Sequence, residues 1–158
     1  MNFTIKPNEK VMIAGSTGSG KSILVKTLVG FYDYEGSIKI GEYEVRDLNK
    51  KAVRENICLL LQDSYLFSRT IAENIKILVP YITYPEIVEL SNFFSFHNDV
   101  TKFDKGYDSE IGRNGMVLSK GQKQRLVLVR AYTKSKPIMI FDDSFSAIDR
   151  INKKKILE

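Results

Sequence analysis

Apolar residues in this chain gather into short runs separated by polar and glycine-rich segments, which predicts a mixture of strands and helices. Residues 11–14, 57–61 and 138–141 are continuous apolar runs of strand length. Such runs are expected for strands that are buried on both faces of a parallel sheet. Residues 22–29 instead place apolar side chains at helical spacing, and Gly30 supplies a stop signal. The pattern therefore predicts an α/β fold.

The segment between the second and third predicted strands has the pattern of helices. Residues 71–78 and 85–96 read as helices, and a further helix is predicted from Lys120 to about Lys134. Upstream, residues 37–40 and 43–45 flank a glycine as a short antiparallel hairpin. We expect a core sheet interrupted by a helical subdomain, the core being residues 1–62 and 137–158 and the subdomain about 63–136.

Composition excludes several classes of protein. The 158 residues suit about one domain, and the contents of 43% hydrophobic and 27% charged residues are close to the averages of soluble globular proteins. The longest apolar run has five residues, whereas a transmembrane helix needs roughly 20. Charged residues near the N-terminus interrupt any signal-peptide core. We expect neither a membrane span nor export, and the single cysteine, Cys58, fits a reducing compartment.

The net charge of +5 is spread evenly along the chain. Proteins that bind nucleic acid usually concentrate basic charge on one face. We therefore expect no nucleic-acid partner.

A glycine-rich segment follows the first predicted strand and satisfies the pattern G-x-x-x-x-G-K-[ST]. Glycines let the backbone approach an anion, so that successive amide groups can point at phosphate oxygens. The helix that follows adds unpaired N–H groups and the positive end of its dipole. Lys21 would reach the β- and γ-phosphates, and the Ser22 hydroxyl would bind Mg²⁺. The predicted nucleoside triphosphate site consists of Gly15, Ser16, Thr17, Gly18, Ser19, Gly20, Lys21 and Ser22.

Two acidic residues, Asp142 and Asp143, follow the last predicted strand. A phosphate-binding loop needs a carboxylate at the end of a neighbouring strand to hold Mg²⁺, and Asp142 is the candidate. Asp143 would point to the opposite side of the extended chain, where a carboxylate could act as general base on an attacking water.

Ser119 and Gln122 have the spacing of a capping box, which predicts that a helix begins at Lys120. The N-terminus of this helix would be a second anion site. On its own, a capping box is an ordinary helix start.

Taken together, these residues resemble the ATP-binding domain of ABC transporters, in order and spacing along nearly the whole chain. In this resemblance Gln62 is the Q-loop glutamine, Asp142 ends the Walker B strand, and residues 146–149 are the D-loop. The signature motif is Leu118, Ser119, Lys120, Gly121 and Gln122. Residues 65–75 and 106–112 look like the corresponding stretches of exporter-type domains. In those domains the second stretch touches the coupling helices of the membrane domain.

The resemblance implies a P-loop NTPase core sheet with an inserted helical subdomain, and a function in ATP-driven export. Two such domains, in a homodimer or heterodimer, would hold ATP and Mg²⁺ between the loop of one and the signature helix of the other. Gln62 would contact Mg²⁺ or water. Closing on ATP and opening after hydrolysis would drive a transmembrane partner, so the domain would lie at the cytoplasmic face of the cell membrane.

The sequence departs from the family pattern at several positions. Asp143 stands where active members carry glutamate, which predicts slow or absent hydrolysis and a non-identical partner chain. Lys120 replaces the first glycine of the signature, and we read it as a tolerated variant. The adenine-stacking residue and the switch histidine fall outside both ends, so we interpret the chain as the central portion of a longer domain. His97 cannot replace that histidine and is expected at the surface of the helical subdomain.

Three alternatives stay open from the residues alone. A non-hydrolytic regulatory subunit is favoured by Asp143. A soluble ABC protein that acts on nucleic acid is disfavoured by the even charge. A small-molecule kinase would share the glycine-rich loop but would not need the signature motif.

Overall fold

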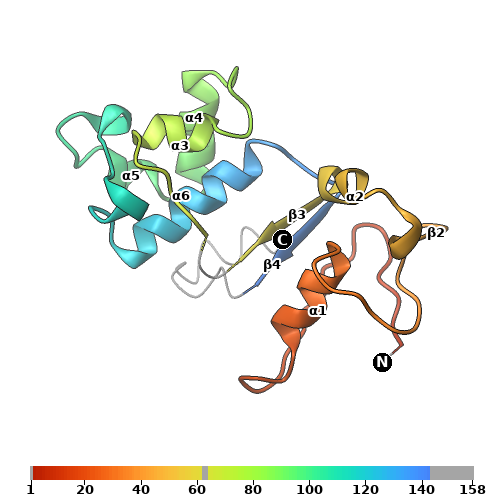
Figure 1. Cartoon of the computed structure of the whole chain (residues 1–158). Helices are drawn as coiled ribbons and strands as arrows, with labels where there is room; N and C mark the ends of the chain where they lie inside the picture. The colour runs from red at the N-terminus through yellow and green to blue at the C-terminus, as the bar shows by residue number, and fades with distance from the viewer. Residues whose placement is uncertain (1, 62–63, 143–158) are drawn as a thin grey trace.

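The computed structural model of the chain describes residues 2–61 and 64–142 (Figure 1). In chain order, the elements of the described residues are α1 (Lys21–Leu28), β1 (Lys39–Ile40), β2 (Tyr43–Glu44), η1 (Val45–Asp47), α2 (Lys50–Asn56), β3 (Ile57–Leu60), α3 (Ile71–Lys76), α4 (Tyr84–Phe93), α5 (His97–Val100), η2 (Gly106–Asp108), η3 (Arg113–Gly115), α6 (Lys120–Tyr132) and β4 (Ile138–Phe141), where η marks a short 3-10 helix.

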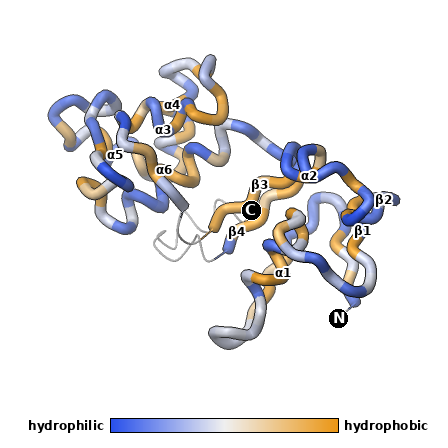
Figure 2. Tube along the Cα trace, in the orientation of Figure 1, coloured by the Kyte–Doolittle hydropathy of each residue, from blue (hydrophilic) through white to orange (hydrophobic). Residues whose placement is uncertain are grey.

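Two parallel strands, β3 and β4, form the centre of the fold. Ile57 pairs with Ile138, and Leu60 pairs with Phe141. Figure 2 shows both strands as strongly apolar. Because parallel neighbours cannot be joined by a tight turn, the chain leaves β3, builds the helices α3 to α6, and returns as β4. The carboxyl ends of the two strands therefore lie at the same edge of the pair.

Two hydrophobic clusters cover opposite faces of this strand pair. On β3, Ile57 and Leu59 belong to the smaller cluster, whereas Cys58 and Leu60 belong to the larger one. Residues of β4 alternate in the same way, as the pleat of a strand requires. The smaller cluster includes residues of α2, η1 and the hairpin, and the larger one is formed mainly by α3 to α6.

Helix α6 forms the middle of the larger cluster. It packs against α3, α4 and β3, and Leu126, Leu128 and Val129 are fully buried. Burying a side chain of this size stabilises a fold by about 1.5–3 kcal/mol. The helix that begins at the signature motif is thus anchored along most of its length.

Most predicted elements are confirmed. Their counterparts are α1 for residues 22–29, β1 and β2 for the hairpin, β3 for 57–61, α3 for 71–78, α4 for 85–96, α6 for 120–134, and β4 for 138–141. Helix α4 ends early, at Phe93, because Ser95 adopts a left-handed conformation with φ 53°. The Phe96 amide then donates to the Ser91 carbonyl at 2.7 Å, which closes the helix end. Within the described residues, no helix has the length and apolar character that crossing a bilayer demands.

The strand predicted at residues 11–14 is wrong for the described structure, where this run forms no strand. Val11, Met12 and Ile13 are 48%, 87% and 39% exposed. A parallel strand owes its stability to ladder bonds with its neighbours and to cover on both faces. Among the described residues, β4 pairs only with β3, so no ladder holds residues 11–14. The core sheet is accordingly smaller there than the sequence predicts.

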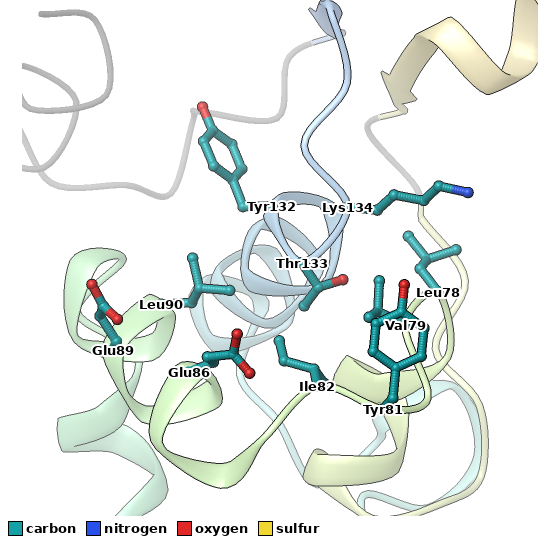
Figure 3. Close-up of a pocket in the computed structure, with 10 residues that line it drawn as sticks. All are labelled: Leu78, Val79, Tyr81, Ile82, Glu86, Glu89, Leu90, Tyr132, Thr133 and Lys134. Carbon is teal, nitrogen blue, oxygen red and sulfur yellow. The ribbon is translucent and has the colours of Figure 1, made fainter.

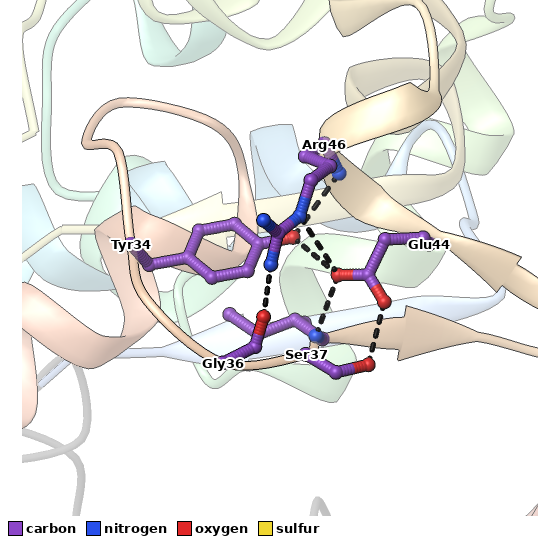
Figure 4. Close-up of polar contacts among 6 residues, drawn as sticks. Tyr34, Gly36, Ser37, Glu44 and Arg46 are labelled. Atoms are coloured by element: carbon purple, nitrogen blue, oxygen red, sulfur yellow. Dashed lines mark hydrogen bonds and ion pairs between the residues drawn. The ribbon is translucent and has the colours of Figure 1, made fainter.

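The hairpin of β1 and β2 is held by a cluster of polar contacts around Glu44 (Figure 4). Its carboxylate accepts hydrogen bonds from the Tyr34 hydroxyl at 2.9 Å, the Ser37 hydroxyl at 2.5 Å and the Ile38 amide at 2.9 Å. Arg46 donates to the same carboxylate at 3.4 Å. The Ser37 hydrogen bond is the largest of the causes that lower the pKa of Glu44 from 4.5 to about 2. The cluster favours the charged carboxylate.

Replacement of Glu44 by Gln is expected to remove a pH-dependent part of the stability. Because folding lowers the pKa of Glu44, its contribution is complete above pH 4.5 and is lost as the pH falls towards 2. Urea midpoints of wild type and Glu44→Gln should therefore differ at about pH 6 and converge at about pH 2. Glu42→Gln, at the exposed turn of the same hairpin, is the matched control. A difference that stays constant over this range would contradict the assignment.

Candidate functional site

The glycine-rich loop leads directly into α1, as the motif predicts. Gly18 and Gly20 have φ angles of 81° and 90°, which side chains other than glycine rarely adopt. Gly20 is also the N-cap of α1. The two glycines thus turn the backbone back on itself at the start of the helix, and the Ser19 amide donates to the Ser16 carbonyl at 3.2 Å.

Lys21 lies across this loop. Its ammonium donates to the Gly15 carbonyl at 2.7 Å and to the Ser16 carbonyl at 2.9 Å, and it lies 3.4 Å from the Ser19 hydroxyl oxygen. These contacts hold a positive charge over the concave side of the loop. The first residue of α1 therefore holds its positive charge against the loop.

Backbone amides in and after the loop are available to a ligand. In the part of the chain that the structure describes, the amides of Thr17, Gly18, Gly20, Lys21 and Ser22 donate no hydrogen bond to protein. Free N–H groups at a helix start are the usual partners of phosphate oxygens. The loop therefore has unpaired donors and one ammonium among the residues predicted to bind phosphate, and the binding itself stays a prediction.

Asp142 continues from β4 at the carboxyl edge of the strand pair. Its amide donates to the Leu60 carbonyl at 2.8 Å, which extends the pairing of β3 and β4 by one bond. Its side chain is partly exposed. Gln62 and Asp143, the other two candidates at this edge, lie outside the described residues.

The start of α6 has the predicted capping box. The Ser119 hydroxyl accepts from the Gln122 amide at 3.3 Å, and the Ser119 amide donates to the Gln122 side-chain oxygen at 2.9 Å. Ser119 and Lys120 are exposed, while Gly121 and Gln122 are partly exposed. The helix thus presents its positive end and the Lys120 charge to solvent.

The structure does not bring the two helix starts together. In Figure 1 the N-terminus of α6 lies at the outer end of the helical part, well apart from the loop that precedes α1. Residues 15–22 and residues 119–122 each take their conformation from local structure, the glycine turns in one case and the capping box in the other. One copy of the described chain therefore keeps the two groups of residues apart.

The two exporter-like stretches, in contrast, lie against each other. Thr70 and Glu110 form an antiparallel bridge, and the Ile111 amide donates to the Arg69 carbonyl at 3.2 Å.

Asn74 is fully buried and forms hydrogen bonds within the stretch 65–75. Its side chain accepts from the Phe67 amide at 2.9 Å and donates to the carbonyls of Phe67 and Thr70 at 3.0 and 2.9 Å.

Asn74→Asp is expected to destabilise the fold by about 2 kcal/mol at pH 7, because a buried carboxylate would face two carbonyl oxygens in place of a donor. Burial raises the pKa of such a carboxyl group above its unfolded value. The loss should therefore be largest at neutral pH and shrink as the pH falls to about 4, where the carboxyl group is protonated in the folded state and begins to be protonated in the unfolded one. Urea unfolding at both pH values measures it. Asn98→Asp, at an exposed residue, should change stability by less than about 0.5 kcal/mol, and an equal loss in both variants would contradict the role of Asn74.

A cavity of about 450 Å³ lies in the helical part (Figure 3). Its walls come from the turn after α3, from α4 and from the end of α6, namely Leu78, Val79, Tyr81, Ile82, Glu86, Glu89, Leu90, Tyr132, Thr133 and Lys134. Figure 3 shows the two glutamates on one side and Lys134 on the other. This cavity is separate from the glycine-rich loop.

Sequence reasoning missed two polar contacts in the helical part. Arg125 of α6 forms an ion pair with Asp99 of α5. His97, which was expected at the surface, is partly buried, stacks on Tyr107 and lies within hydrogen-bond distance of its hydroxyl. No local pattern marks either pair, because their partners are 26 and 10 residues apart.

Comparison with known proteins shows the family. The family model described as "ABC transporter" matches residues 1–146. The chain belongs to the ABC transporter family. This ABC chain is 37% identical over 158 residues to the multidrug resistance-like ATP-binding protein MdlA of Escherichia coli. That match covers 99% of the chain and 27% of MdlA. It is 37% identical over 150 residues to the putative multidrug export ATP-binding/permease protein YgaD of Bacillus subtilis. That match covers 94% of the chain and 26% of YgaD.

A solved structure of a bacterial Atm1-family ABC exporter with ATP bound superposes on the ABC chain with a TM-score of 0.82 and 32% identity, over 89% of this chain and 25% of that one. The likeness supports the predicted ABC ATPase fold. The ABC chain spans about a quarter of the length of these relatives.

Proposed function

We propose that the ABC chain binds Mg²⁺ and ATP between its glycine-rich loop and the signature helix of a second ABC domain, and that this binding powers export. The observation that carries the proposal is the pair of open helix starts, at Lys21 and Lys120, which lie apart in one chain (Figure 1). A head-to-tail pair of domains would bring the start of α6 in one domain to the loop of the other. Both would then face the same phosphates.

The described residues fit a triphosphate and its metal. The unpaired amides and the Lys21 ammonium match phosphate oxygens. The Ser22 hydroxyl and the Asp142 carboxylate, with Gln62, are oxygen ligands of the kind that Mg²⁺ prefers beside substrate phosphates. No cluster of three His, Cys, Asp or Glu suited to a metal occurs among the described residues, which agrees with a metal held largely by phosphate. Mg²⁺ would neutralise charge on the phosphates.

ATP binding and hydrolysis would move a transmembrane domain, which lies in the same polypeptide or in another. YgaD is named as an ATP-binding/permease protein, and the solved relative is an exporter. The paired stretches 65–75 and 106–112 are the candidate contact with that partner, because they expose Tyr65 and Phe67, at 58% and 40%, next to each other. The ABC chain would then be held at the cytoplasmic face of the cell membrane by its partner.

Hydrolysis is the part of the function that Asp143 limits. Asp143 would act as general base, and its shorter side chain favours a site that holds ATP longer than it cleaves it. This observation supports a second candidate function, that of a non-hydrolytic regulatory subunit paired with a chain that carries glutamate at the corresponding position.

Nucleotide-dependent association tests the proposal. The ABC chain and its partner domain are expected to associate in sedimentation experiments with Mg²⁺ and ATP, and to separate with Mg²⁺ and ADP, because only the γ-phosphate would bridge the loop and the second helix start. Association that is equal in ATP, ADP and buffer would contradict the composite site. ATP-dependent association without turnover would favour the regulatory subunit.

A further inference from the structure

The short helix α5 contacts both surfaces to which the proposed function gives a role. On one side it contacts α6, the helix that begins at the signature motif. On the other it contacts η2, the first part of the stretch 106–112. The residues of α5 that make these contacts, His97 and Asp99, are two positions apart in the sequence.

The contact with α6 is a partly shielded ion pair. Two nitrogens of the Arg125 guanidinium, Nε and Nη2, donate to one carboxylate oxygen of Asp99 at 2.9 and 2.5 Å. The two side chains are only 19% and 16% exposed. Ion pairs that are shielded from water and joined by two hydrogen bonds are stronger and more directional than exposed ones. Arg125 follows the capping residue Ser119 by six positions, so the pair holds α5 against the first half of α6.

The contact with η2 combines a hydrogen bond and ring stacking. Nδ1 of His97 lies 3.0 Å from the Tyr107 hydroxyl oxygen. The two rings are stacked, with centroids 5.9 Å apart and planes at 27°, and Tyr84 packs edge-on against the Tyr107 ring. Tyr107 is 5% exposed. Burial raises the pKa of the Tyr107 hydroxyl, so it stays protonated and able to hydrogen-bond.

Apolar anchors prevent α5 from moving independently. Phe96 immediately before the helix and Val100 at its end are both fully buried in the larger cluster. Apolar packing itself is non-directional and does not by itself set the orientation of the side chains on α5. The two polar contacts are directional, and they are held on one rigid, anchored segment. The two contacts therefore link α6 to Tyr107 through a single segment.

We propose that Asp99 and His97 are positioning residues that couple nucleotide binding at the start of α6 to the stretch 106–112. The proposal rests on the proposed function, since it takes the signature helix as a nucleotide site. Neither residue touches nucleotide. Each acts through its partner, Asp99 through Arg125 and His97 through Tyr107.

Hydrogen exchange in the assembled protein tests the coupling with Mg²⁺ and ATP as the only ligand. In wild type, ATP should slow exchange of backbone amides at residues 118–122 and, about threefold or more, at 106–112. In Asp99→Asn and in Tyr107→Phe, the slowing at 118–122 should persist while that at 106–112 disappears. Asn98→Ala, at an exposed residue of the same helix, should behave as wild type.

Further variants separate positioning from folding. Asp99→Arg combined with Arg125→Asp should restore the response at 106–112, because it rebuilds the ion pair with reversed charges. If Asp99→Asn loosens the subdomain, hydrogen exchange in α3 will rise even without nucleotide. In that case Tyr107→Phe, which alters the other contact, shows whether the slowing at 106–112 depends on the coupling.

Slowing at 106–112 that survives in both single variants would overturn the coupling, as would wild-type slowing confined to 118–122. Absence of any effect at 118–122 in wild type would overturn the proposed function itself, and the coupling with it.

Discussion

Lys21→Ala is expected to weaken binding of Mg²⁺ and ATP by at least about 100-fold. The ammonium lies over the glycine-rich loop, where it donates to the Gly15 and Ser16 carbonyls at 2.7 and 2.9 Å. Bound phosphate would replace these carbonyls as its partners. Hydrogen bonds to charged groups contribute about 1.5–3 kcal/mol each, so the loss of two of them accounts for a factor of this size.

Isothermal titration with Mg²⁺ and ATP measures this change in the assembled protein. Lys26→Ala is the matched control, because Lys26 has the same charge and lies in the last turn of the same helix, away from the loop. Its dissociation constant should stay within about threefold of the wild-type value, since a charge effect at that helix end is worth at most about 0.5 kcal/mol for the distant ligand. Equal losses in Lys21→Ala and Lys26→Ala would show that general positive charge, rather than the loop geometry, holds the nucleotide.

Asp143→Glu is expected to raise ATP turnover about 100-fold when the ABC chain is paired with its partner domain. Aspartate is one methylene shorter than glutamate, which withdraws the carboxylate by about 1.5 Å. Misplacement of a reacting group by about 1 Å costs roughly 100-fold in rate. Asp142 is fixed by its bond to Leu60 at the edge of the strand pair, so the backbone before position 143 is held and the side-chain length is what changes.

Turnover of wild type, Asp143→Glu and Asp143→Ala under saturating Mg²⁺ and ATP measures this effect. We expect slow turnover in wild type, fast turnover in Asp143→Glu, and turnover in Asp143→Ala close to that of wild type. Unchanged ATP affinity in all three would assign the difference to the chemical step. A robust wild-type rate that Asp143→Ala abolishes would remove the basis for a degenerate site.

Features that depend on neighbouring residues in the sequence could be predicted. The start of α1 is encoded in the glycine-rich loop itself, and the start of α6 in the pairing of Ser119 with Gln122 three positions later. The alternation of β3 and β4 between two clusters likewise follows from their short apolar runs. Capping and glycine conformations act over a few bonds, so the sequence pattern alone is sufficient to place them.

Features that depend on distant partners could not be predicted. Residues 11–14 have the composition of a buried strand, but a strand forms only against a neighbour, and the described residues provide none. The early end of α4 depends on the left-handed Ser95 and on a hydrogen bond back to Ser91. The contacts of α5 join residues that only the packing of the helical part brings together. Gln62 and Asp143 stay predictions, since they lie outside the described residues.

In the proposed arrangement, one ATP contacts the loop of one domain and the signature helix of another. An ATP analogue with a photoreactive group on the γ-phosphate, bound with Mg²⁺ to the assembled protein and followed by peptide mapping, tests it directly. We expect labelling of residues 15–22 in one chain and of the signature segment in its partner, both lost in Lys21→Ala. Labelling of the loop and of residues 118–122 within the same chain, or of the loop alone, would contradict it.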